Sequence, residues 1–434
     1  MKFKKIAATV ALLAAVTATA NFRETVDRVS MKTFSVYRSW AEADSTFKCG
    51  VIIQTPADPT PRRLPAHVVV AIDVSREMQG EPLTYAKKAA SHILNRLQDG
   101  DYFSVISFST YTRTVFPLQR INSGIRRTAE SGIDGIASES NRNLVEGMDA
   151  AVAQFERFKG QSASGRHLFI FTNGDADKGT VENPQVLSHA YSLSQKASID
   201  ISTFGIEYSY NEKLLSEIAN KTGGSYYYAE EPELLEALVE QEIRRVIMPA
   251  ARSVRLRVDL PKSTTISEVF GGEKSGAYIK VGGVPAAARQ LVFFELKGRP
   301  VRQQECIVEM EYTEPESQDA RIERGYVDIA LTDGNADYEP EIAPYYLVFS
   351  LMEQLVTYSG HVYKNRRGYT DFFRSRLIDL EQENVAFDSD FLQKSFVYLE
   401  QLDRRISNTA VEPEELVKGI KFDMLQFLRG NLIK

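Results

Sequence analysis

The sequence predicts a doubly wound α/β domain that is joined to an all-β domain and followed by a helical region. Strand-like and helix-like segments alternate strictly over residues 66–248, and the apolar period changes to two after Pro249. From residue 340 onward the apolar spacing becomes helical. Because residues 29–54 also have strand-like patterns, we expect the α/β domain to be inserted into an antiparallel β-sandwich.

The first 20 residues have the features of a secretory signal. A basic start, MKFKK, precedes the apolar stretch IAATVALLAAVTA and the small-x-small sequence Ala18-Thr19-Ala20. This stretch is short for a membrane anchor, since a spanning helix takes roughly 20 apolar residues. We therefore predict cleavage after Ala20 and export to a periplasm or beyond. The mature chain is expected to have no transmembrane segment.

Residues 21–65 contain the first strands of the sandwich and a linker. The linker is TPADPTPRRLP (55–65), whose prolines cannot sit in a strand ladder. The α/β domain (66–248) begins with a continuous apolar run, as is typical of a strand buried on both faces. Its expected strands are HVVVAID, GDYFSVISF, TRTVFPLQ, HLFIFT, IDISTFGI and SYYYA. Its expected helices are PLTYAKKAASHILNRL, NLVEGMDAAVAQFERF, NPQVLSHAYSLSQKA, NEKLLSEIANKTG and PELLEALVEQEIRRVI.

Residues 249–339 are expected to complete the sandwich. Their expected strands are SVRLRVDL, AYIKV, RQLVFFELK, ECIVEMEYT and RGYVDIALTD, with Gly, Pro and Asp turns between them. Residues 340–434 are expected to form four helices whose apolar faces require burial. These helices are PYYLVFSLMEQLVTYSG, DFFRSRLIDLEQ, DFLQKSFVYLEQLDRRI and PEELVKGIKFDMLQFLRG.

Two cysteines stand far apart in the chain. Cys49 and Cys306 each lie on the apolar side of a strand-like run. In an oxidising compartment such a pair can form a disulfide, which is the prediction here. The alternative is two free thiols in a hydrophobic core. A bridge would place both segments in one folding unit.

Composition and motifs narrow the function. The 434 residues are 43% hydrophobic and 25% charged with a formal net charge of -6, so they offer no broad basic surface for nucleic acid. The chain has no G-x-S-x-G elbow, no H-E-x-x-H and no phosphate-binding glycine loop. His67 and His167 stand at the start of two expected strands, but two imidazoles are too few for a zinc site. We therefore expect a non-enzymatic protein.

The α/β region contains, in this order, the segments VVVAIDVSREM, DGDYFSVISFS, NLVEGMDAAVAQF, HLFIFTNG, IDISTFGI and LLSEIANKTGGSYYYAEEPELLEAL. Taken as an ordered set, they resemble the von Willebrand factor A domain. The resemblance spans about residues 66–248. The flanking strands also resemble those of exported proteins in which a β-sandwich brackets this domain, as in the inter-alpha-trypsin inhibitor heavy chains.

The resemblance implies a cation site whose motif is only partly present. Family members often hold Mg²⁺ or Mn²⁺ through an Asp-x-Ser-x-Ser loop, a threonine and a further aspartate. Asp73 and Ser75 match this pattern, whereas Glu77 stands at the second serine and Asn173 at the last aspartate. Arg142 stands at the threonine, although a loop shift would offer a neighbouring polar residue instead.

Charge separates two hypotheses for this loop, and a solvated loop without either contact is the third. A guanidinium about 4 Å from a dication would cost on the order of 8 kcal/mol at an effective dielectric near 20. If Arg142 points inward, we expect it to pair with Asp73 or Glu77 in place of an ion. If it points outward, Asp73, Ser75 and Glu77 could hold Mg²⁺ or Mn²⁺ with help from Asp175.

The favoured hypothesis is an exported, non-catalytic protein that binds or scaffolds protein partners without a cofactor. Its partner surface would be centred on Asp73, Ser75, Glu77, Arg142 and Asn173. One alternative is a metal-dependent adhesion or ligand receptor that uses Mg²⁺ or Mn²⁺. Another is an accessory subunit of an exported or membrane complex that docks through its C-terminal helices.

Overall fold

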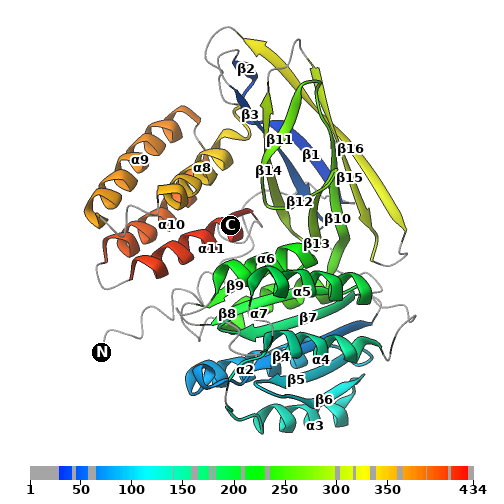
Figure 1. Ribbon diagram of the computed structural model, residues 1–434. Helices are drawn as coiled ribbons and strands as arrows, with labels where there is room; N and C mark the ends of the chain where they lie inside the picture. The colour runs from blue at the N-terminus through cyan, green and yellow to red at the C-terminus, as the bar shows by residue number, and fades with distance from the viewer. Residues whose placement is uncertain are drawn as a thin grey trace.

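The structure is a computed structural model in which three parts of the chain can be distinguished (Figure 1). It contains an α/β domain, a β-domain made of two further sheets, and a C-terminal group of helices. The residues described are 29–41, 45–56, 65–139, 141–156, 158, 165–174, 179, 182–206, 211–229, 235–298, 304–315, 319–332, 339–358, 365–387, 389–408 and 412–428.

The α/β domain is built on a mixed six-stranded sheet. The sheet order is β6-β5-β4-β7-β8-β9, and only β6 runs antiparallel to its neighbour. Counted along the chain this is the order 3-2-1-4-5-6 of doubly wound folds. The strands are β4 (Ala66–Asp73), β5 (Tyr102–Phe108), β6 (Thr112–Arg120), β7 (Gly165–Thr172), β8 (Asp200–Ile206) and β9 (Tyr226–Ala229).

Helices cover both faces of this sheet because its central strand is apolar on both sides. Val68, Val70 and Ile72 of β4 contribute to one core, and Val69 and Ala71 contribute to the other. The first core is shared with α2 (Glu81–Arg96), α3 (Ser123–Asp134) and α7 (Leu235–Ile247). The second is shared with α4 (Leu144–Glu156), α5 (Asn183–Ala197) and α6 (Glu212–Thr222).

Helix α3 was not expected from the sequence. It contains two glycines, which weaken the helical pattern. Its start is stabilised by Asn122, whose side chain accepts hydrogen bonds from the backbone N–H groups of Gly124 and Ile125. Ala129 and Ile133 bury one side of the helix in the domain core. Capping and burial therefore outweigh the cost of the glycines.

The β-domain consists of two sheets that draw on both ends of the chain. One sheet has the order β1-β3-β14-β11, and the other has the order β12-β13-β10-β15-β16-β2. The β3 strand before the α/β domain pairs with β14 after it, from Thr46 opposite Lys297 to Gln54 opposite Arg289. The strands are β1 (Ser30–Ser35), β2 (Ser39–Ala41), β3 (Thr46–Gln54), β10 (Pro249–Asp259), β11 (Thr264–Phe270), β12 (Glu273–Ser275), β13 (Tyr278–Pro285), β14 (Arg289–Gly298), β15 (Gln304–Thr313) and β16 (Ala320–Thr332).

The sequence missed three short or exposed strands of this domain. Strands β2 and β12 have only three residues each, and β11 has a largely exposed side-chain pattern. None of them offers the sustained alternation by which a strand is recognised. Strand β2 also pairs in parallel with β16, so that sheet is not wholly antiparallel as expected.

The C-terminal helices share a core with one sheet of the β-domain. Phe293 of β14 stacks on Phe349 with ring centroids 4.8 Å apart. Near the other end of the helical group, the Lys421 ammonium lies 3.2 Å from the Glu212 carboxylate of α6. These contacts join the helices to both domains. The helices are α8 (Ala343–Thr357), α9 (Arg366–Phe387), α10 (Asp390–Ser407) and α11 (Pro413–Leu428).

The predicted Cys49–Cys306 disulfide is wrong. Both residues lie fully buried in one hydrophobic core, but both are free thiols. Burial raises the pKa of Cys49 well above its usual value, and the nearby Cys306 adds to this effect. Burial likewise raises the pKa of Cys306 to about 12. Because thiol oxidation proceeds through the thiolate, this apolar core keeps both groups in the unreactive form.

The predicted signal segment 1–20 lies outside the described residues. In the part of the chain that the structure does describe, every helix is too short or too polar to cross a membrane.

Candidate functional site

A buried polar cluster lies where the order of strands in the α/β sheet reverses. Asp73 ends β4, and Thr172 ends the neighbouring strand β7. The two strands are parallel, so their carboxyl ends meet at one edge of the sheet. In doubly wound folds this crevice is the usual place for a ligand.

Asp73 is the centre of the cluster and is fully buried. Its Oδ1 accepts a hydrogen bond of 2.8 Å from the backbone N–H of Ser75. Its Oδ2 accepts one of 2.6 Å from the Thr172 hydroxyl and one of 2.6 Å from Nε of Arg142. Three donors from three parts of the chain therefore hold one carboxylate.

Arg142 fills the space beside this carboxylate. Its side chain is 2% exposed, and it points inward rather than toward solvent. Its Nη2 lies 2.8 Å from Oε2 of Glu77 and 3.3 Å from Oγ of Ser75. The guanidinium thus joins two carboxylates, one buried and one that is 56% exposed.

The chain segment that carries Arg142 is fixed on both sides. The backbone N–H of Glu139 donates to the carbonyl of Val74, and that of Asn143 donates to the carbonyl of Ser109. The Ser109 hydroxyl in turn donates to the Glu139 carboxylate over 2.6 Å. These bonds tie the segment before α4 to the ends of β4 and β5, so they direct Arg142 toward Asp73.

Burial and charge act in opposite directions on Asp73. Burial raises the pKa of this carboxyl above its ordinary value, while the Arg142 guanidinium and the hydrogen bonds from Thr172 and Ser75 lower it. Removing either partner of such a buried pair leaves an uncompensated charge, which is strongly destabilising. The pair is therefore integral to this edge of the domain.

As placed here, these side chains do not fit a divalent cation. The family site would use Asp73 and Ser75 as ligands, but both already contact the Arg142 guanidinium. A dication about 4 Å from the guanidinium would add repulsion on the order of 8 kcal/mol at an effective dielectric near 20. Magnesium also requires near-octahedral oxygen coordination, for which the guanidinium leaves no room beside Asp73.

The structure brings together Asp73, Ser75, Glu77 and Arg142 of the predicted surface. Asn173 follows Thr172 and is buried, but its Oδ1 has no hydrogen-bond partner among the described residues. Asp175, the fourth suggested metal ligand, lies outside the described part of the chain.

Thr172 is a site residue that the sequence analysis missed. Its hydroxyl donates to Asp73 and accepts from the backbone N–H of Gly174. The available signal was its place at the end of the apolar run HLFIFT, directly before Asn173. At the carboxyl end of a buried parallel strand, a terminal hydroxyl faces the ligand edge of the sheet.

An exposed aromatic side chain lies beside the cluster. Tyr111 is 77% exposed in the turn between β5 and β6. Its carbonyl accepts a hydrogen bond from the backbone N–H of Ser109, the residue that also holds the Arg142 segment. Large exposed aromatics of this kind often mark contact surfaces.

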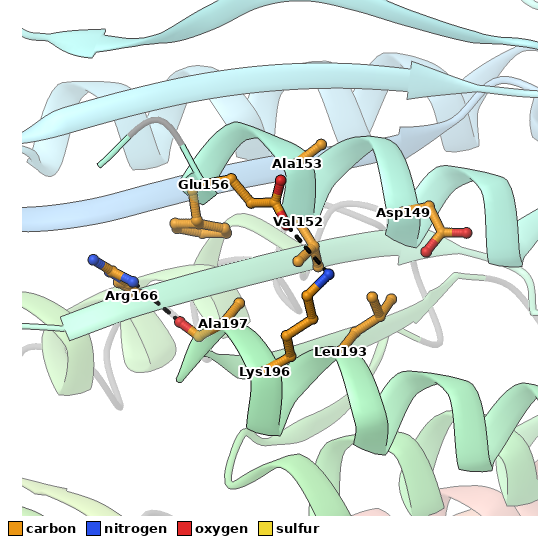
Figure 2. Close-up of a pocket in the computed structure, with 9 residues that line it drawn as sticks. Asp149, Val152, Ala153, Glu156, Arg166, Leu193, Lys196 and Ala197 are labelled. Carbon is orange, nitrogen blue, oxygen red and sulfur yellow. Dashed lines mark hydrogen bonds and ion pairs between the residues drawn. The ribbon is translucent and has the colours of Figure 1, made fainter. Parts of the chain in front are cut away.

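A separate cavity of about 150 Å³ lies between α4 and α5 (Figure 2). Figure 2 shows Lys196 pointing toward Glu156 and Arg166 donating to the carbonyl of Ala197. The Lys196 ammonium lies 3.4 Å from the Glu156 carboxylate. Its remaining walls are mainly apolar, including Val152, Phe155 and Leu193. This arrangement contains no pairing of nucleophile and base, so we assign no chemistry to it.

Comparison with known proteins agrees with the fold of the α/β domain. Residues 67–241 match the model of the von Willebrand factor type A domain. The Synechocystis sp. protein sll0103 is 28% identical over 182 residues, which cover 42% of each chain. YfbK of Escherichia coli is 23% identical over 270 residues, or 59% of this chain and 46% of that protein. The chain thus matches less than half the length of either relative.

Two solved structures share the architecture well beyond this domain. A von Willebrand factor type A protein from Catenulispora acidiphila has a TM-score of 0.64 at 16% identity and covers 85% of this chain and 89% of its own. The ArnB paralog VWA2 from Sulfolobus acidocaldarius has a TM-score of 0.58 at 14% identity, with coverage of 94% and 99%. Residues 67–241 of this chain thus match the von Willebrand factor type A domain model, and the solved structures share the fold.

Proposed function

We propose that this chain is an exported, non-catalytic binding protein that presents the carboxyl edge of its von Willebrand A sheet to a protein partner. The carrying observation is the Arg142 guanidinium, which contacts Asp73 and Glu77 in the place where family members hold a cation. In this proposal the ion pair replaces the metal, so that partner binding needs no divalent ion.

A protein partner fits both the family and the exposed chemistry of this edge. Domains of this type usually mediate protein interactions. More than half of the Glu77 side chain is exposed to solvent, and Tyr111 is 77% exposed. Together they offer a carboxylate and an aromatic anchor over a rigid buried network, a combination that suits recognition by polar contact and shape.

The contacts of the site also support a non-catalytic role. The Ser75 hydroxyl lies 3.3 Å from a guanidinium nitrogen, and a guanidinium cannot remove its proton. The Thr172 hydroxyl donates to Asp73, a carboxylate that is already paired with Arg142. The β-domain and the helices then serve as support. We take the two sheets of the β-domain as the predicted sandwich, since side chains from both form one core.

Affinity capture with the full mature chain tests this proposal. Bait protein is incubated with the exported fraction of the native cells, with and without a chelator, and the retained proteins are identified. We expect the same specific partner in both conditions. A Tyr111→Ala, Glu77→Ala double variant should lose that partner. A control variant on the distant β-domain face, Arg324→Ala, should keep it. Loss of the partner on chelation would contradict the cation-free proposal.

A further inference from the structure

A polar cavity lies at the opposite end of the α/β sheet from Asp73, where that domain meets the β-domain. It has a volume of about 190 Å³. His167 and Asp200 face it from the starts of β7 and β8, where they are register partners. Arg252 of β10 and Gly283 of β13 complete it from the β-domain. Figure 1 shows these two strands reaching the α/β domain.

A buried network forms one wall of this cavity. Glu242 of α7 is 1% exposed and accepts hydrogen bonds from the Ser202 hydroxyl over 2.6 Å and from the Tyr227 hydroxyl over 2.8 Å. Arg245 lies 3.3 Å from the same carboxylate and donates to the carbonyl of Gly283. The charges of Glu242 and Arg245 therefore largely cancel, so this pair adds little net charge to the cavity.

The remaining charged groups leave the cavity positive. Arg252 has a buried Nη2 without a hydrogen-bond partner among the described residues. Arg166 also lines the cavity, and its guanidinium donates to two carbonyl oxygens, which carry no formal charge. Asp200 is the second carboxyl in the lining. Besides the imidazole of His167, three guanidiniums thus face two carboxylates.

We propose that this cavity binds a small oxyanion, such as sulfate, phosphate or a short carboxylate, with Arg252 as its principal contact. A buried guanidinium nitrogen without a hydrogen bond is costly, and a planar guanidinium is well suited to an oxyanion. Ser198 and Ser253 line the same space, and a serine hydroxyl can donate a further hydrogen bond to an anion. The volume suits a tetrahedral oxyanion and is below the usual range for nucleotide-sized ligands.

Binding here would couple the two domains. The anion would contact Arg252 on β10 together with groups at the start of β7 and β8, so it would be held only when both domains are in place. By mass action a ligand that binds only the folded, docked arrangement stabilises it. The site lies at the opposite end of the sheet from Asp73, and its test is therefore independent of the proposed partner surface.

Calorimetric titration of the full chain with sodium sulfate tests the inference. Ionic strength is held constant with sodium chloride, and sulfate is chosen because its charge does not change between pH 5 and 8. We expect a single site with a dissociation constant of about 1 mM or tighter. Inorganic phosphate and citrate serve as further probes for anion class. If the wild-type chain binds none of the three anions, the proposal is overturned.

Variants locate the site. Arg252→Gln should weaken sulfate binding by about tenfold or more, whereas Arg257→Gln, on the same strand but paired with Glu309 outside the cavity, should bind as the wild type does. Ser253→Asp adds a negative charge at the cavity mouth without touching the buried network. Its φ of 49° is one that Asp tolerates. Ser253→Asp should also weaken binding, and unchanged affinity in both cavity variants overturns the assignment.

Discussion

Nε of Arg142 lies 2.6 Å from Oδ2 of Asp73, in a site where both side chains are at least 98% buried. The two residues are 69 positions apart in the chain and meet because β4 ends beside the segment before α4. The same guanidinium also contacts Glu77. The oxygen atoms of this loop that would otherwise be ligands of a metal therefore contact the Arg142 guanidinium, a cation that belongs to the chain itself.

Removing the guanidinium should destabilise the protein strongly. Arg142→Ala leaves Asp73 buried and unpaired, so we expect a loss of about 3 to 5 kcal/mol in the free energy of unfolding. Urea denaturation followed by circular dichroism measures it. The matched control is Arg113→Ala, because Arg113 is 75% exposed and pairs with Glu139 at the rim of the same site. Its expected loss is below about 1 kcal/mol, and equal losses in both variants would contradict this account.

Restoring the family pattern should create a cation site. The triple substitution Arg142→Thr, Glu77→Ser and Asn173→Asp removes the positive charge and supplies oxygen ligands around Asp73. We expect this variant to bind Mn²⁺ with a dissociation constant below about 1 mM by calorimetry. Adding Asp73→Ala should abolish the signal. A correctly folded triple variant that does not bind Mn²⁺ would contradict this prediction, because residues at other positions would then also prevent cation binding.

The fold was largely predictable from the sequence, and the errors have identifiable physical causes. The alternation of buried strands and amphipathic helices in residues 66–248 indicated the α/β domain. Helix α3 depends on the Asn122 cap and on tertiary packing, which periodicity does not show. The disulfide error came from the apolar patterns around Cys49 and Cys306, which place both thiols in one core but say nothing about their oxidation.

The site was predictable only in part. A motif comparison identified Asp73, Ser75, Glu77 and Arg142, and the charge argument suggested that Arg142 pairs with Asp73 or Glu77. It could not give the direction of the Arg142 side chain, which depends on backbone hydrogen bonds from Glu139 and Asn143 to other loops. Thr172 was missed because a lone hydroxyl at a strand end has no distinctive spacing.

Acid should destabilise the protein partly through His67. This histidine is 1% exposed beside Tyr102 and Phe158, and burial lowers its pKa to about 4. In the unfolded chain it takes up a proton near pH 6.5, so its contribution is complete above that pH and is lost as the pH falls toward 4. The two values imply a loss of about 3 kcal/mol over this window.

Unfolding free energies measured between pH 7 and 4 check this expectation. A His67→Phe variant keeps an aromatic ring against Tyr102 and Phe158 but cannot be protonated, so its stability should fall less steeply with acid. His189→Asn is the control, since His189 is more than one third exposed and pairs with Asp149 on the surface. Parallel curves for the wild type and His67→Phe would refute the role of His67.

The C-terminal helices should be thermodynamically coupled to the β-domain. Phe349 is fully buried between Phe293 and Phe270, and its replacement by alanine leaves a cavity. We expect Phe349→Ala to lower the free energy of unfolding by about 3 to 5 kcal/mol. Val397→Ala, at a position 62% exposed on α10, should change it by less than about 0.5 kcal/mol. A second, independent unfolding transition for the helices would contradict the coupling.

The most direct test of the central claim is a calorimetric titration of the wild-type chain with Mg²⁺ and Mn²⁺. If the Arg142 guanidinium occupies the position of the cation, the chain shows no saturable binding of either metal up to about 10 mM. The triple variant described above serves as the positive control under the same conditions. Binding tighter than about 1 mM that disappears in Asp73→Ala would contradict the account.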